Sequence, residues 1–314
     1  MASPPRFPLI DAPSPLHALP RFCEALGGRV DLWAKREDLL PLAFGGNKLR
    51  NLEFLIGEAL ARGADTVITS GRRWSNHARL TAAAGARAGL RVHLVLSGPQ
   101  VDPPGPAIRL SSSFGATLHL LPTADRAERE ATVERVAAEV EAAGGRPYVI
   151  GVGGSGAIGA HGQLLAMGEI LEQAAAIGLG LDRIVLPTAT GGTHAGLLAG
   201  RPESMAVTGV VVARSAAELR PVIAAMVDAL GSVVEPSVID LDESQLGDGY
   251  GRRTAAAEEA AALLARTEAI LVDPIYTAKA LAGLVAGVRS SAWDGERIVF
   301  WHAGGLPGLF EPLD

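Results

Sequence analysis

The sequence predicts an α/β protein built on mainly parallel sheets. From about residue 50, short apolar and β-branched runs alternate with longer segments of helical spacing, as in βα units. The length of 314 residues allows two domains or one large α/β unit. Apolar residues make up 48% and charged residues 20% of the chain, which is typical of an ordinary folded protein.

Seven strands are expected, each an apolar run bounded by Gly, Pro or charge. They are Thr66–Ser70, Arg91–Leu96, Thr117–Leu121, Pro147–Ile150, Arg183–Pro187, Ala206–Ala213 and Arg297–Trp301. Three other segments have clear helical patterns: Leu49–Arg62, Arg126–Ala143 and Ala255–Arg266. The βα units between residues 51 and 155 are expected to form a small α/β domain. Residues 1–50 and 156–314 are expected to form a larger one.

Charge and composition narrow the class of partner. Lys and Arg number 28 against 34 Asp and Glu, a net charge of −6, so nothing suggests binding to nucleic acid or an anionic membrane. No segment approaches the 18 apolar residues of a spanning helix, so we expect a soluble protein with a small-molecule partner. Cys23 is the one cysteine and the N-terminal segment lacks a secretory apolar core, which favours the cytoplasm. The histidines show no metal-ligand spacing, so no metal site is expected.

Ligands of open parallel sheets bind where loops leave the carboxyl ends of strands. RIVLPTATGGTHAGLLAG, residues 183–200, predicts a strand, a loop with Thr190, Gly191, Gly192 and Thr193, and a helix. Free amides, two hydroxyl groups and the positive end of a helix would together bind an anion. Because the segment lacks the lysine of a P-loop, a single phosphate fits better than a nucleotide. A purely structural turn is the alternative.

Lys48 follows two glycines and an asparagine in AFGGNKLRNLEF and opens an expected helix. An ammonium is disfavoured at a helix start, and a desolvated lysine loses its proton readily. Such an amine is suited to form an imine with an aldehyde. A solvated surface charge is the alternative.

Two further turns follow expected strands. In TSGRRWSNHARL, Ser75 or Asn76 can cap a helix, and His77 in its first turn is either a polar site residue or simply partly exposed. In YVIGVGGSGAIGAHG, residues 148–162 fit the G-x-G-x-x-G spacing of a dinucleotide site, but the next strand lacks the acidic residue that binds a ribose. A tight glycine turn, or part of a ligand cleft, are the alternatives.

Six sequence blocks, in order over nearly the whole chain, resemble the D-cysteine desulfhydrase and 1-aminocyclopropane-1-carboxylate deaminase family. They are KREDLLPLAFGGNKLRNLEFLIGEAL, SNH, ATGGTHAG, GDGYG, DPIYTAKALAGL and GGLPGLF. The resemblance implies a tryptophan synthase β-like enzyme of fold type II that uses pyridoxal 5'-phosphate (PLP). It also implies two open twisted, mainly parallel sheets flanked by helices, a cofactor cleft between the domains, and a homodimer.

The resemblance also implies residue roles. Lys48 matches the lysine that forms the imine with PLP, and the loop Thr190, Gly191, Gly192 and Thr193 matches the phosphate site. Asn76 matches the residue beside the cofactor ring, Ser75 a residue that binds the substrate carboxylate, and Tyr276 the active-site tyrosine. Trp74, His77 and Thr277 are expected at the substrate as well.

Several residues depart from the family pattern. Leu49 and Asn51 replace Thr and Lys, which removes a positive charge and is expected to lower PLP affinity. Arg72, Arg73 and Trp74 crowd the turn before Ser75, so a changed substrate pocket is expected. Gly156 replaces Asn, Gln163 replaces Tyr, and Ala303 replaces the Thr that follows the last histidine.

The expected reaction is α,β-elimination from a small amino acid, with D-cysteine giving pyruvate, ammonia and sulfide. Deamination of 1-aminocyclopropane-1-carboxylate to 2-oxobutyrate is one alternative, which Thr277 disfavours because the deaminases have Glu there. The other is a PLP-binding homologue with altered or lost activity in a specialised biosynthetic pathway.

Overall fold

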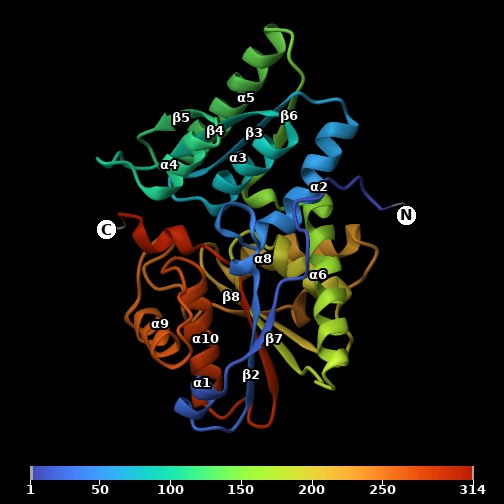
Figure 1. Ribbon diagram of the computed structural model, residues 1–314, viewed down its shortest axis with the longest axis vertical. Helices are drawn as coiled ribbons and strands as arrows, with labels where there is room; N and C mark the ends of the chain where they lie inside the picture. The colour runs from blue at the N-terminus through green and yellow to red at the C-terminus, as the bar shows by residue number, and fades with distance from the viewer. Residues whose placement is uncertain (1–2, 313–314) are drawn as a thin grey trace. The chain divides into compact units, whose positions relative to one another are not determined.

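The computed structural model describes residues 3–312, and its internal contacts divide the chain into two compact units (Figure 1). Unit 1 comprises the segment up to Asp11, Lys48–Gly162 and Phe310–Pro312. Unit 2 comprises Ala12–Asn47 and Gln163–Leu309. The small domain expected at residues 51–155 and the larger one expected at 1–50 with 156–314 stay a prediction.

Unit 1 contains a parallel sheet of four strands in the order β5-β4-β3-β6. The strands are β3 (Thr66–Arg72), β4 (Arg91–Ser97), β5 (Thr117–Leu121) and β6 (Pro147–Ile150). The helices are α2 (Lys48–Ala61), α3 (Asn76–Ala88), α4 (Pro106–Ser113) and α5 (Arg126–Ala142). Alternate β4 residues point to opposite faces: Leu94 packs with Ala82 of α3, and Val95 packs with Val136 of α5.

Unit 2 contains a sheet of six strands in the order β1-β2-β10-β7-β8-β9, in which β1 and β2 pair antiparallel and the other neighbours pair parallel. The strands are β1 (Leu16–Ala18), β2 (Asp31–Arg36), β7 (Arg183–Thr188), β8 (Ala206–Val211), β9 (Asp240–Asp242) and β10 (Arg297–His302). The helices are α1 (Pro20–Ala25), α7 (Gly192–Gly200), α8 (Ala216–Ala229), α9 (Ala255–Glu268) and α10 (Thr277–Arg289), with α6 (Ala157–Ala176) from Gln163 onward. Short 3-10 turns are η1 (Glu37–Leu39), η2 (Leu42–Phe44), η3 (Val152–Gly154), η4 (Pro236–Val238) and η5 (Leu306–Phe310).

The central strands of unit 2 are buried on both faces. Phe300 of β10 packs into a cluster with residues of α1, α9 and α10, whereas Trp301 packs into a cluster with residues of α6, α7 and α8. Strands covered on both sides read as continuous apolar runs, which is why β7, β8 and β10 could be recognised from sequence.

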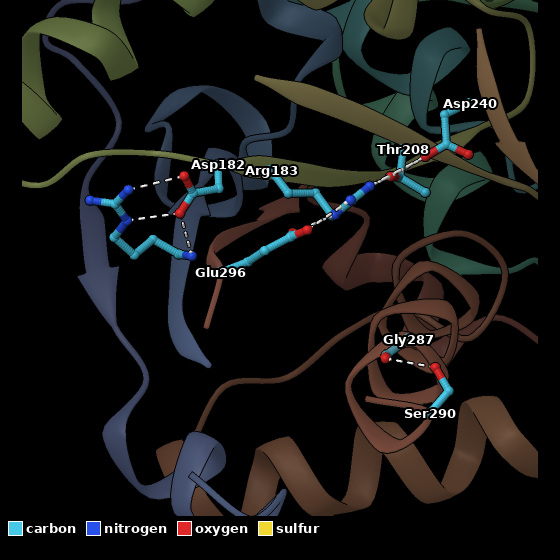
Figure 2. A network of polar contacts seen from close by, with 8 residues as sticks. Asp182, Arg183, Thr208, Asp240, Gly287, Ser290 and Glu296 are labelled. Carbon is cyan, nitrogen blue, oxygen red and sulfur yellow. Dashed lines mark hydrogen bonds and ion pairs between the residues drawn. The ribbon is translucent and has the colours of Figure 1, made fainter. Parts of the chain in front are cut away.

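Ion pairs lie at the end of this sheet where β7 and β10 begin (Figure 2). Arg183 binds the Glu296 carboxylate through two nitrogen atoms, at 2.7 and 3.0 Å, and also donates to Thr208 at 2.7 Å. Asp182 accepts from the Arg297 guanidinium at 2.8 and 3.0 Å. At the opposite end of the sheet, where these strands finish, the loops carry polar side chains.

All seven expected strands are present, and Thr117–Leu121 and Pro147–Ile150 have the expected bounds. Three strands were not predicted: β1, β2 and β9. The segment DLWAKR of β2 has three charged residues, and no apolar pattern marks it as a strand. No helix between residues 3 and 312 combines the length and apolar character needed to cross a bilayer.

Candidate functional site

Each unit has a point where neighbouring strands connect in opposite directions, which is where open α/β sheets bind ligands. In unit 1 this point lies between β3 and β6, because β4 and β5 continue to one side of β3 and β6 lies on the other. In unit 2 it lies between β7 and β10, because β8 and β9 lie on the other side of β7. The loops that follow these strands carry most of the residues singled out in the sequence.

The loop after β7 has the backbone of an anion site. Gly191 precedes α7 with a φ of +87°, and a Cβ there would lie 2.8 Å from Ile223 Cγ1, so both conformation and space require glycine. The first amide groups of a helix have no acceptor within the helix, and they carry its partial positive charge. Gly192 and Thr193 form the first turn of α7, as expected, while Thr190 lies in the turn before it.

Asn47 makes three hydrogen bonds within unit 2, one of them to this loop. Its Nδ2 donates to Thr193 Oγ1 at 2.9 Å, and its backbone N–H donates to the Ala303 carbonyl at 3.0 Å. Its own carbonyl accepts from Gln163 Nε2 at 2.8 Å. Because Thr193 Oγ1 accepts here, its hydroxyl hydrogen is left to donate. Asn47 was not predicted as a site residue, whereas Gln163 was noted as a departure from the family pattern. Lys48 is the next residue after Asn47 in the chain.

Lys48 is the first residue of α2, as the sequence predicted. The side chain keeps some exposure, yet desolvation of its amine lowers the pKa from 10.5 to about 8. No carboxylate among the described residues acts to raise it again. A substantial fraction of this amine is therefore neutral near physiological pH, and a neutral amine is the nucleophilic form.

The turn after β3 presents three polar residues at the start of α3. Ser75 caps the helix, and its Oγ accepts from the Ala78 N–H at 3.2 Å, so the hydroxyl hydrogen can still donate. Asn76 Oδ1 accepts from Arg79 at 3.4 Å, which leaves the Asn76 amide nitrogen as a donor. This end of α3 therefore offers donors to an anionic group.

His77 is buried and neutral. Burial, with a smaller contribution from the Lys48 charge, lowers the pKa of His77 to about 3. The Thr69 hydroxyl donates its one hydrogen to the Ile150 carbonyl at 2.8 Å, so it must accept from His77 Nε2 at 3.0 Å. This assigns the hydrogen to Nε2 and leaves Nδ1 as a buried acceptor without a partner between residues 3 and 312. The partly exposed alternative for His77 is wrong.

The arginines before Ser75 bind other groups of unit 1. Arg73 is buried and donates to the Gly98 carbonyl at 2.7 Å, and Arg72 lies over the Trp74 ring, 5.2 Å from its centre. The positive charges in this turn are therefore already engaged within unit 1, and Trp74 is the large group that remains beside Ser75.

The glycine turn after β6 is a structural contact with α2. The buried Asn51 amide donates to the Gly154 carbonyl at 3.1 Å, and a Cβ at Gly154 would lie 3.1 Å from His77 Cε1. Gly153, Gly154 and Gly156 all have positive φ. Asn51, which stands where the family pattern has lysine, thus supports the turn that packs on His77.

Tyr276 and Tyr250 form a pair in unit 2. Their hydroxyl groups are hydrogen-bonded to each other, and the ring centres lie 5.8 Å apart. Burial and the neighbouring hydroxyl raise the pKa of Tyr276 well above its usual range, so the phenol keeps its hydrogen. Sequence reasoning predicted Tyr276 but missed Tyr250, whose only signal was its place in the GDGYG block.

Asp273 organises the segment that carries Tyr276. Its carboxylate accepts from the backbone N–H groups of Ile275, Tyr276 and Thr277 at 3.0, 2.8 and 3.1 Å. The Thr277 hydroxyl also donates to this carboxylate. Thr277 is therefore buried and committed to Asp273.

No cluster of three or more His, Cys, Asp or Glu within residues 3–312 is arranged to bind a metal.

Comparison with known proteins agrees with this arrangement. The family described as "Pyridoxal-phosphate dependent enzyme" matches residues 8–304. The chain is 40% identical to D-cysteine desulfhydrase of Salmonella typhi over 320 residues, covering 98% of this chain and 95% of that one. A crystal structure of an ACC deaminase homologue has a TM-score of 0.89 at 35% identity, covering 98% of this chain and 94% of the other. Serine racemase of Dictyostelium discoideum shares the fold, with a TM-score of 0.65 at 18% identity, 94% of this chain and 92% of that one being covered.

Proposed function

The chain belongs to the family of pyridoxal-phosphate-dependent enzymes, and on this premise we propose that it catalyses α,β-elimination of D-cysteine to pyruvate, ammonia and sulfide. The relative named D-cysteine desulfhydrase is 40% identical over nearly the full length of both chains. The likeness to the ACC deaminase homologue supports the same fold type.

One observation carries the assignment of the cofactor site. The Asn47 side chain binds Thr193 in the loop before α7, and Lys48 follows Asn47 directly. Covalent connection thus links a lysine of lowered pKa to a residue held by an anion-binding loop. An aldehyde that carries a phosphate ester needs these two groups, an amine and an anion site. The residues present therefore fit PLP, with Lys48 at its aldehyde and Thr190, Gly191, Gly192 and Thr193 at its phosphate.

The family's cofactor, once joined to a substrate amine, withdraws electrons from the α-carbon and so makes the α-proton acidic. Lys48 supplies the other half of that step. Its amine would hold the aldehyde of the cofactor and, when free, would take the α-proton, because the lowered pKa of about 8 leaves part of this amine neutral near physiological pH.

The start of α3 orients the substrate. Ser75 Oγ and the Asn76 amide nitrogen both have hydrogens left to donate, and the positive end of a helix stands behind them. We propose that Ser75 binds the substrate carboxylate and Asn76 the cofactor ring. Trp74 completes this side by limiting the size of the substrate, whereas the buried, neutral ring of His77 packs against the Gly154 turn.

The tyrosine pair supplies the proton for the leaving group. Because one hydroxyl donates to the other, the accepting tyrosine is the one that can pass a hydrogen to the leaving group, and we assign this role to Tyr276. When the Cβ–S bond breaks, the bonding electrons leave with sulfur, and this hydrogen converts the thiolate to hydrosulfide or hydrogen sulfide. Water then replaces nitrogen on the unsaturated product, which gives pyruvate and ammonia. In this proposal the Thr277 hydroxyl binds the Asp273 carboxylate, which also accepts from the Tyr276 backbone N–H.

The test supplies the PLP-loaded enzyme with D-cysteine, L-cysteine, β-chloro-D-alanine and 1-aminocyclopropane-1-carboxylate in separate reactions. The proposal expects pyruvate from D-cysteine in equal amount to sulfide, and pyruvate from β-chloro-D-alanine. Production of 2-oxobutyrate alone would instead establish the deaminase reaction. With cofactor bound and no product from any of the four, both reactions would be rejected for this chain.

Assembly and location are also proposed. We infer a homodimer in the cytoplasm, supported by the resemblance to the family and by the single, unpaired Cys23. Sedimentation of the PLP-loaded enzyme should give twice the chain mass of 32.4 kDa, and a mass of one chain would contradict the dimer.

A further inference from the structure

Lysine is rare in this chain, and its use is informative. Lys35, Lys48 and Lys279 are the only lysines among 28 basic residues, and all the others are arginine. Lys35 and Lys279 are fully buried, and Lys48 has the lowered pKa described above. Arginine thus supplies every other positive side-chain charge, and none of the three lysines is an exposed surface residue. An ammonium differs from a guanidinium in being compact, with donors that can converge on nearby acceptors.

The Lys279 ammonium donates hydrogen bonds to backbone carbonyl groups. It lies in the first turn of α10, where the helix dipole disfavours a positive charge. Its Nζ donates to the Leu246 carbonyl at 2.7 Å and to the Gly249 carbonyl at 3.1 Å. Burial lowers the pKa of Lys279, and Asp248 acts in the opposite direction. Burial and the helix dipole therefore both disfavour the positive charge of Lys279 at this position. The ammonium binds one short turn, which contains Leu246 and Gly249.

That turn leads directly into Tyr250. Gly247, Gly249 and Gly251 have φ of +59°, +111° and +80°, so glycines let this segment reverse direction. Glycines also leave the backbone many other conformations, and this segment needs external contacts to stay in one. The two bonds from Lys279 are such contacts, and they end one residue before the tyrosine.

The first turn of α10 therefore serves both tyrosines. Tyr276 precedes the helix and is held by Asp273, while Lys279 three residues later binds the turn before Tyr250. We propose that Lys279 is a positioning residue that holds the Tyr250 hydroxyl against that of Tyr276. In its catalytic part, the delivery of a proton to the leaving group, this inference rests on the proposed function.

The chain offers a direct probe, because Tyr148, Tyr250 and Tyr276 are its only tyrosines. With ¹³C at the tyrosine Cζ atoms, the PLP-loaded enzyme should give three resonances, assigned with Tyr148→Phe and Tyr250→Phe. In the parent enzyme, Tyr250→Phe should shift the Tyr276 resonance, since it removes the hydrogen-bond partner. In a Lys279→Met background, Tyr250→Phe should leave the Tyr276 resonance unchanged. The Tyr148 resonance should not move and serves as the internal check that the fold is intact.

Kinetics provide a second readout that loss of stability alone would not produce. Thiolate needs a proton when it leaves and chloride does not, so Lys279→Met should lower kcat for D-cysteine by about tenfold or more. For β-chloro-D-alanine, kcat should fall by less than about threefold. Lys35→Met, at the other fully buried lysine, is the matched control and should change both substrates equally. Should Lys279→Met not fold, Lys279→Gln removes the charge but keeps amide donors, and its loss for D-cysteine should be smaller.

The outcomes separate this inference from the proposed function. Persistence of the Tyr250–Tyr276 coupling in folded Lys279→Met would overturn the positioning role, and equal losses for the two substrates would overturn its catalytic part. If the parent enzyme forms no product from either substrate while Lys279→Met abolishes the coupling, the proposed function fails and the positioning role stands.

Discussion

Lys48 differs from an ordinary lysine in the medium around its amine. Removing water from an ammonium costs free energy that no carboxylate within residues 3–312 offsets, so the proton is held less tightly and the pKa falls to about 8. The local pattern left Lys48 open between an imine-forming amine and a surface charge, and the resemblance to the family singled it out. Sequence could not give the extent of desolvation, which depends on packing from other segments.

The first prediction concerns the pH dependence of PLP attachment to the apo-enzyme. Only the neutral amine attacks an aldehyde, so the rate should rise about tenfold per pH unit below 8 and level off above it. Stopped-flow absorbance near 410–420 nm follows the reaction, in the range the resemblance implies for the bound cofactor. Lys48→Arg should show no such phase. A rate that keeps rising to about pH 10.5, the ordinary lysine value, would contradict the lowered pKa.

At the scale of secondary structure, Ser75 has two tasks that substitutions can separate. It caps α3, and we propose that it binds the substrate carboxylate. Glycine at a cap costs only a few tenths of a kcal/mol, whereas alanine costs about 1 kcal/mol. Ser75→Gly should therefore keep the free energy of unfolding close to that of the parent and still raise KM for D-cysteine by about tenfold or more.

Asp125→Ala provides the matched control, because Asp125 caps α5 in the same unit. It should lower the free energy of unfolding by about 1 kcal/mol and leave KM unchanged. If Ser75→Gly leaves KM as it was, Ser75 is a cap alone and the carboxylate is bound elsewhere.

The loop before α7 gives a second prediction at this scale. Gly191→Ala adds a Cβ at positive φ and 2.8 Å from Ile223 Cγ1, which should displace the loop and weaken PLP binding by at least about tenfold. Gly28 also has positive φ, at +67°, but has nothing within 4 Å of an added Cβ. Gly28→Ala should therefore lower thermal stability without changing the PLP dissociation constant. Equal PLP affinity in both variants would remove the loop from the cofactor site.

Sequence predicted the elements of the site far better than the contacts within it. The loops after β3, β6, β7 and the helix start at Lys48 follow from local patterns that the structure confirms. Tyr250 was missed because it lies in a coil of glycines and meets Tyr276 across 26 residues, a pairing that no local pattern encodes. Asn47 was missed for the same reason, since its partner Thr193 is 146 residues away. Strand β2 escaped notice because it buries Lys35 in a polar network within unit 2.

Over the whole molecule, buried neutral histidines should make stability depend on pH. Burial lowers the pKa of His77 to about 3 and that of His194 to about 4, from an ordinary 6.5. Between about pH 4 and 6.5 the unfolded chain therefore binds protons that the folded chain does not, so stability falls as pH falls. Each such group contributes up to about 1.4 kcal/mol per pH unit.

Urea unfolding of the apo-enzyme at several pH values tests this. His194→Gln should reduce the slope of unfolding free energy against pH, between pH 4.5 and 6, by the equivalent of about one proton. An unchanged slope in this variant would mean that His194 is already protonated in the folded protein, contrary to its burial.

The most direct test of the account is the site of covalent cofactor attachment. Borohydride reduction of the PLP-loaded enzyme fixes the cofactor to the amine that holds it, and peptide mass spectrometry then identifies that amine. With only three lysines in the chain, the candidates among side chains are Lys35, Lys48 and Lys279. The account predicts that the modified peptide contains Lys48 and that Lys48→Ala abolishes the modification. A modified Lys35 or Lys279, or a bound cofactor that reduction leaves unattached, would contradict it.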